Sequence, residues 1–125
     1  MPTPVVLINE RTRKLVAEHV EVADTRRARR RGLLGRTHLD DGDALMLIPC
    51  FTVHTAFMRF TIDLIFLDRD GCVVRTVSRL QPWRTAMAWR AHSVVELPAG
   101  RLERCEIETG DRLYLSPLRQ HQRAS

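Results

Sequence analysis

One acidic residue lies inside an otherwise apolar stretch of the sequence. Asp63 is surrounded by the apolar side chains of segment 62–67. A buried carboxylate must be paired, hydrogen-bonded or neutralised, because transfer out of water disfavours its charged form. Its partner could be Arg36, Arg59, His54 or backbone N–H groups at the adjacent turn. Asp63 is therefore either a brace for this turn and the neighbouring helix end or part of a polar pocket.

His54 is the residue that could make Asp63 catalytic. It lies between Val53 and Thr55 in a predicted apolar strand. A histidine there is either a hydrogen-bonded core residue or an acid/base or ligand-binding group. If the Asp63 carboxylate orients the imidazole, the two residues form an acid/base pair. His54 and Asp63 are thus the candidate catalytic residues, and whether the protein is an enzyme stays open.

A metal site would require at least three distant side chains to converge. The available ligands are His54, Asp63, His92, Glu96 and Cys50. No HxH, HxxxH or HExxH spacing supports such a site, so we predict no metal. The sequence identifies no cofactor.

Aromatic and basic side chains lie close together in the long irregular segment 79–92. Loops that carry aromatic residues on a rigid β scaffold commonly form binding rims. Tryptophan beside arginine suits stacking against a sugar or aromatic ring together with contacts to an anion, although the same side chains could cap the open end of the core. The predicted ligand-binding residues are Arg36, Arg59, Trp83, Arg84 and Trp89.

The densest basic cluster lies in segment 26–36 and consists of Arg26, Arg27, Arg29, Arg30, Arg31 and Arg36. It is either a solvated helix face or a phosphate-binding surface whose affinity would fall steeply with salt. No tryptophan or phenylalanine lies in this cluster. It therefore offers bases nothing to stack on.

Composition narrows the classes that need to be considered. The 125 residues carry 20 basic and 15 acidic side chains, for a net charge of +5, and Lys14 is the only lysine. This size predicts one domain over residues 1–125. No apolar run reaches the roughly 18 residues that cross a bilayer, and the start of the chain lacks a signal-peptide pattern, so we expect a cytoplasmic location. Cys50, Cys72 and Cys105 show no CxxC spacing, and their role stays open.

Apolar patterning predicts about eight short strands. Segment 62–67 is apolar at both odd and even positions except at Asp63, so both faces of the strand would be buried, which is typical of a central strand. Asp70-Gly71 predicts a tight turn to a partner strand over 72–77. The other expected strands cover residues 4–8, 15–22, 44–48, 51–58, 93–97 and 112–115.

One helix is expected over residues 26–34. Thr25 is a favourable N-cap, and Gly35 can adopt the left-handed conformation that ends many helices. Short strands at this spacing, with one helix and no βαβ alternation, predict an all-β sandwich or barrel. Residues 116–125 are expected to form a frayed tail.

Several motifs resemble those of the bacterial and archaeal family known as domain of unknown function 192. Over roughly residues 20–115 they are Arg31-Gly32-Leu33-Leu34-Gly35-Arg36, His54-Thr55-Ala56-Phe57-Met58, the segment 61–68, Gly71, Pro82-Trp83, Val95-Glu96-Leu97-Pro98-Ala99-Gly100 and Gly110-Asp111. The resemblance implies a compact β-sandwich of jelly-roll character and implies no reaction. Two features depart from the family pattern. Many relatives carry an export signal, and many have an aromatic, Met, Lys, Asn stretch where this chain has Phe57-Met58-Arg59-Phe60.

We therefore favour a binding module for a small polar or anionic ligand, such as a saccharide or a phosphate compound. Trp83 and Trp89 would form its walls, and Arg59 or Arg84 would contact the anion. The first alternative is an enzyme that uses Asp63 and His54 as an acid/base pair. The second, less favoured, is a nucleic-acid binder that uses the arginines of segment 26–36. The oligomeric state stays open.

Overall fold

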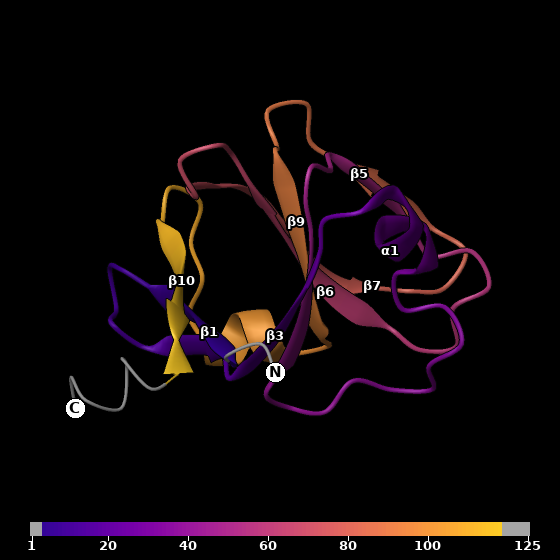
Figure 1. Cartoon of the computed structure of the whole chain (residues 1–125), viewed down its shortest axis with the longest axis horizontal. Coiled ribbons are helices and arrows are strands. Elements are labelled where there is room, and N and C mark those ends of the chain that lie inside the picture. The colour runs from indigo at the N-terminus through magenta and orange to yellow at the C-terminus, as the bar shows by residue number, and fades with distance from the viewer. Residues whose placement is uncertain (1–3, 119–125) are drawn as a thin grey trace.

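The computed structural model describes residues 4–118, which form ten strands and two short helices (Figure 1). The strands are β1 (Val5–Asn9), β2 (Leu15–Ala17), β3 (His19–Ala23), β4 (Asp43–Leu47), β5 (Thr52–His54), β6 (Ile62–Leu67), β7 (Val73–Leu80), β8 (Thr85–Met87), β9 (Ser93–Pro98) and β10 (Leu113–Pro117). The helices are α1 (Arg26–Arg31) and α2 (Arg101–Arg104). The mainly β fold class is confirmed.

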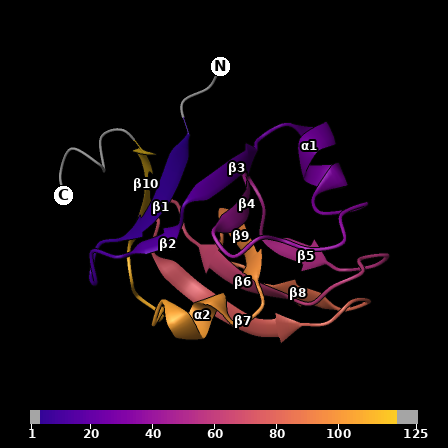
Figure 2. The same cartoon turned by 90° about the horizontal axis from the view of Figure 1, so that it is seen from below.

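A five-stranded sheet in the order β3-β4-β9-β6-β7 forms the middle of the molecule. One of its faces packs against α2 and the sheet β10-β1-β2, and the other packs against α1 and the two-stranded ladder β5-β8. Figures 1 and 2 show the small sheet and the ladder on opposite sides of the molecule. Across residues 4–118 no strand order returns to its first strand, so the sheets form no closed barrel. The jelly-roll character stays a prediction.

Strand β6 is an interior strand of this sheet, as its sequence predicts. All six of its residues are buried, and it pairs with β7 on one side and β9 on the other. Because successive side chains of a strand point to opposite faces, Leu64 and Phe66 enter the apolar cluster beneath α1, whereas Ile65 and Leu67 enter the cluster beneath β1. The predicted hairpin to β7 is confirmed, and the Asp68 carboxylate accepts the N–H groups of two turn residues.

The helix is shorter than predicted, and it connects two parallel strands. The Thr25 hydroxyl caps α1 by accepting the N–H of Ala28, but the helix ends at Gly32, not at Gly35. Gly32 has φ +47°, a conformation that residues with a side chain rarely adopt, so the chain leaves the helix there. Strands β3 and β4 flank this helix and pair in parallel, which corrects the expectation of no βαβ unit.

Other segments differ from their expected form because strand pairing overrides local pattern. The predicted strand 51–58 is limited to β5, which pairs with β8 in the segment predicted to be irregular. The predicted turn after Leu97 leads into the second helix, α2. Strand β10 continues to Pro117, so residues 116 and 117 are part of a sheet and not of the predicted tail. Residues 119–125 of the predicted tail lie outside the described residues. Neither described helix is long and apolar enough to span a membrane.

Candidate ligand-binding site

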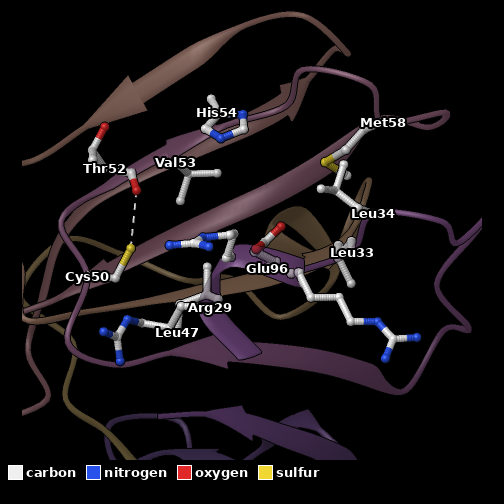
Figure 3. A pocket seen from close by; sticks show the side chains of 13 residues that line it. Arg29, Leu33, Leu34, Leu47, Cys50, Thr52, Val53, His54, Met58 and Glu96 are labelled. Atoms are coloured by element: carbon white, nitrogen blue, oxygen red, sulfur yellow. Dashed lines mark hydrogen bonds between the residues drawn. The ribbon is translucent and has the colours of Figure 1, made fainter. Parts of the chain in front are cut away.

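A small cavity opens between the C-terminal end of α1, strand β5 and the face of the five-stranded sheet that packs against α1 (Figure 3). Its volume is about 90 Å³. The side chain at its floor is that of Glu96, whose carboxyl group lies amid the labelled side chains (Figure 3). The cavity therefore joins a buried acid to solvent.

Glu96 is buried because of its place in the sheet. Strand β9 is flanked by β4 and β6, and Glu96 pairs directly with Leu45 on one side and Leu64 on the other. Only 3% of the residue is exposed. Within residues 4–118 the Glu96 carboxyl group has no hydrogen-bond partner. Every polar side-chain atom that is fully enclosed in this part of the chain does have a hydrogen-bond partner, so the Glu96 oxygens are not fully enclosed. The Glu96 oxygens thus face the cavity and are not sealed in the core.

Burial controls the charge of this carboxyl group. Loss of hydration raises the pKa of Glu96 to about 7, and the positive charge of Arg36 acts in the opposite direction. At neutral pH both protonation states are therefore populated. Glu96 can donate a hydrogen bond as an acid and accept hydrogen bonds as a carboxylate.

The cavity has apolar walls and a basic rim. Leu33, Leu47, Val53 and Met58 line the apolar part. The exposed residues Arg30 and Arg31 border the opening, and within the described chain neither forms an ion pair. His54, Cys50 and Thr52 complete the side formed by β5. A ligand would meet an acid at the bottom and guanidinium groups at the top.

Cys50 offers little nucleophilic character in this setting. Its thiol donates to the carbonyl of Thr52 at 3.1 Å, and burial raises the pKa of the Cys50 thiol. The reactive species is the thiolate, so this environment disfavours covalent chemistry at Cys50.

Asp63 lies on the opposite face of the sheet. It pairs with Leu97, the neighbour of Glu96, so its side chain points away from the cavity. Its carboxylate accepts three backbone N–H groups, from Arg79 at 2.8 Å, Gly100 at 3.0 Å and Leu102 at 3.0 Å. Asp63 therefore joins the end of β7 to the start of α2.

The structure does not bring His54 and Asp63 together. His54 lies on the cavity side of the molecule, and the Asp63 carboxylate is held by backbone donors on the other side. Arg36 and Arg59, proposed as partners of Asp63, are not among its hydrogen-bond partners within residues 4–118. Of the alternatives that the sequence leaves open, the geometry supports the brace.

The five predicted ligand-binding residues do not line the cavity, although Arg36 lies near enough for its charge to act on Glu96. Arg36 donates to the Glu21 carboxylate at 2.6 Å. Trp83 and Trp89 are 59% and 80% exposed and pack against Phe57 and Phe51. Arg59 and Arg84 are also exposed. None of the five lines the Glu96 cavity. Among residues 4–118, no group of three or more potential ligands could hold a metal ion.

Comparison with known proteins shows the family. The model of domain of unknown function 192, described as "Uncharacterized ACR, COG1430", matches residues 7–115. The chain belongs to this family. A UPF0127 protein from Pyrococcus abyssi is 36% identical over 115 residues, which cover 86% of this chain and 95% of that protein. A UPF0127 protein from Thermococcus sibiricus is 32% identical and is matched over 86% of this chain and 73% of its own length.

Solved structures show the same fold. A protein of unknown function from Novosphingobium aromaticivorans superposes with a TM-score of 0.76 at 24% identity, covering 89% of this chain and 83% of that one. A protein from Sinorhizobium meliloti, described as a putative transcription regulator, has a TM-score of 0.75 at 21% identity, covering 90% and 92%. At these identities the likeness concerns the fold alone.

Three of the motifs that carry the resemblance to the domain of unknown function 192 family contribute residues to the cavity. Segment 31–34 supplies its α1 side, His54 and Met58 supply the β5 side, and Glu96 supplies the floor. Sequence reasoning considered Glu96 only as a metal ligand. The signal that could have found it is the one that drew attention to Asp63, namely a lone acid in an apolar strand.

Proposed function

We propose that the protein binds a small ligand whose hydroxyl or amide group enters the cavity and hydrogen-bonds to Glu96, while an acidic group of the ligand contacts Arg30 and Arg31. The observation that supports this proposal is the carboxyl group of Glu96, a residue that is only 3% exposed: it faces a cavity and has no hydrogen-bond partner in residues 4–118. Burial of a polar group without a hydrogen bond costs free energy. A ligand that supplies the missing hydrogen bond recovers part of that cost.

The dimensions of the site limit what enters it. A cavity of about 90 Å³ is smaller than the roughly 150 Å³ cavity that holds benzene in an engineered protein core. It therefore takes one end of a ligand, a group of a few heavy atoms, with the rest of the ligand on the rim. Small hydroxylated acids and sugar phosphates combine such an end with an anion. The proposal includes the cytoplasmic location expected from the sequence.

Acid/base catalysis is a second candidate, and it is favoured by a specific observation. The pKa of Glu96 is raised to about 7 by burial, which is the range in which a carboxyl group exchanges protons efficiently at neutral pH. His54 lines the same cavity. In this version the enzyme alternative uses Glu96 in place of Asp63.

A thermal-shift screen tests the binding proposal. Wild type and Glu96→Leu are compared against hydroxy acids, sugar phosphates and their neutral counterparts, with Glu103→Gln as the control for an exposed glutamate and Trp83→Ala as the control for the distant aromatic side chains. A ligand at 100 times its Kd should raise the Tm of the wild type by roughly 10 °C. The shift should vanish in Glu96→Leu and persist in both controls. Equal stabilisation of Glu96→Leu, or no stabilisation by any compound, contradicts the proposal.

A further inference from the structure

A second surface, separate from the cavity, is built around two strained aromatic residues. Phe57 and Trp83 lie just beyond one end of the β5-β8 ladder, with ring centroids 4.6 Å apart and exposed fractions of 73% and 59%. Their φ angles are +66° and +65°. Bulky residues rarely adopt this conformation, and backbone strain of this kind concentrates at functional sites. Here the strained backbone places two large apolar rings in solvent, where they contribute little to the packing of the core.

A buried threonine fixes both strained loops. The N–H of Trp83 donates to the carbonyl of Thr55 at 3.0 Å, and the N–H of Arg84 donates to its hydroxyl at 2.8 Å. That hydroxyl donates in turn to the carbonyl of Gln81 at 2.7 Å. The ring pair is therefore held in place before any partner arrives, which reduces the entropy lost on binding.

A second aromatic pair lies at the other end of the same ladder. Phe51 and Trp89 stack with centroids 5.7 Å apart at an interplanar angle of 20°. Beside Trp89 is an open groove of about 520 Å³, bordered by Arg75 and Arg90. The Arg75 guanidinium donates to the carbonyl of Met87 and is thereby held near the groove.

Charge distribution favours an anionic partner. Segments 44–62 and 71–95, which contain both aromatic pairs, include five arginines and no aspartate or glutamate. Asp68 also borders the groove, but its carboxylate accepts the N–H groups of Asp70 and Cys72. Arg84 and Arg90 directly follow Trp83 and Trp89 in the chain, and among the residues that line the groove two are arginines and one is an acid.

We propose that this aromatic–arginine surface, formed by Phe51, Phe57, Trp83, Trp89, Arg84 and Arg90, binds single-stranded nucleic acid. Aromatic rings on which bases stack, interleaved with arginines that contact the backbone, are the common means of holding single strands without sequence preference. A duplex hides its base faces and cannot stack on the rings. The arginine cluster around α1 lacks aromatic residues, whereas this surface combines both requirements.

A membrane surface is the competing partner, and the observations favour it less. Membrane-bound surfaces use aliphatic as well as aromatic side chains to enter the lipid. On this surface the exposed large apolar side chains are the four aromatic residues and Met87, whereas Val22, Leu34 and Leu115 lie on other segments of the chain. Their pairing into stacked and tilted ring pairs suits flat bases.

The test measures binding of a fluorescein-labelled 15-nucleotide dT strand, the matching duplex, free thymidine monophosphate and vesicles with anionic lipids. Trp83 and Trp89 are the only tryptophans in the chain, so stacking should also quench the intrinsic fluorescence. Trp83→Ala should weaken strand binding at least about 5-fold, and Trp83→Ala with Trp89→Ala at least about 25-fold. Trp83→Phe should retain most of the affinity. Arg26→Ala with Arg27→Ala, a control that removes charge from α1, should leave the affinity near that of wild type.

Three results would overturn the proposal. The first is an affinity for the strand that the double tryptophan variant does not change while its circular dichroism shows a folded protein. The second is binding of duplex or of the mononucleotide as tight as that of the strand. The third is partition onto vesicles without binding of the strand. Ligand shifts at Glu96 involve none of these residues, so either proposal can fail alone.

Discussion

Two acids occupy neighbouring registers of one sheet, and their partners decide what each does. Asp63 faces three backbone donors, whereas Glu96 faces a cavity. From the sequence both look alike, because each interrupts an apolar strand. The need for a partner at Asp63 could be predicted from the sequence. Which groups supply it could not, because the donors come from the ends of β7 and α2, distant in sequence from Asp63.

Glu96 should make stability depend on pH. Its pKa is about 7 in the folded state against an ordinary 4.5, so between these values the folded protein holds a proton that the unfolded chain releases. Stability therefore falls as pH rises from about 4.5 to 7 and levels off above, by up to roughly 3 kcal/mol. Urea unfolding at a series of pH values should show this decline in wild type and in Glu103→Gln. Glu96→Gln should show a flatter profile, and an identical profile would contradict the account.

Asp63 should matter for stability and not for ligand binding. Asp63→Ala leaves three N–H groups without their acceptor, and we expect a loss of roughly 3 to 5 kcal/mol in the free energy of unfolding. Asp24→Ala, at an exposed position, is the matched control and should cost far less. Chemical denaturation measures both. A loss below about 1 kcal/mol at Asp63 would refute the role as a brace.

At the scale of elements, the turn between β6 and β7 approaches strand β10 closely. Gly71 has φ +85°, and a Cβ atom there would lie 2.6 Å from the carbonyl oxygen of Leu113. Gly71→Ala should therefore destabilise the protein by about 2 to 4 kcal/mol, since backbone must move. Gly110→Ala is the control, because Gly110 has φ +95° with open space around it and incurs only the conformational cost of about 1 kcal/mol. Equal losses in thermal denaturation would show that the close approach does not matter.

Elements with a strong local signal could be predicted, and those defined by long-range pairing could not. The hairpin at Asp70-Gly71 and the cap at Thr25 follow from local turn and cap chemistry. Strand β8 forms because β5 pairs with it across more than 30 residues, and its own sequence gives no clear period. Helix α1 ends early because Gly32 adopts a positive φ. From the sequence, Gly32 and Gly35 were equally able to end the helix in this way.

At the scale of the whole molecule, one polar network closes the small sheet. Asp111, next to β10, accepts the Asn9 amide at 2.8 Å and Arg11 Nε at 2.6 Å. The hydrogen bond from Arg11 keeps the pKa of Asp111 below its ordinary value of 3.8. Its stabilising contribution is therefore complete above pH 3.8 and disappears as the pH falls through the lowered value.

Asp111→Asn should reveal this network. We expect a loss of about 1 to 2 kcal/mol at pH 7, because Arg11 is partly exposed and solvent weakens the pair. The difference from wild type should shrink at pH 3, because below the ordinary pKa of 3.8 the unfolded chain binds a proton more readily than the folded carboxylate, whose pKa is lowered. Urea unfolding at both pH values measures it. A difference that grows in acid would contradict the assignment.

The overall class was accessible from composition and strand count, and the functional surface was only partly so. Trp83 and Trp89 could be recognised as surface candidates from their irregular segment. Their separation from the cavity could not be predicted, because it depends on the pairing of β5 with β8 and on how this ladder packs on the five-stranded sheet. Three motifs of the domain of unknown function 192 family mark the cavity only after folding brings segments 31–34, 54–58 and Glu96 together.

An NMR titration of the Glu96 side-chain carboxyl carbon, assigned by its absence in Glu96→Gln, shows directly whether this acid is buried without a partner. We predict a midpoint near pH 7, as burial without a protein partner requires. A midpoint near the ordinary value of 4.5 would mean that the carboxyl group is solvated or paired, and the ligand-binding site proposed around it would have no basis.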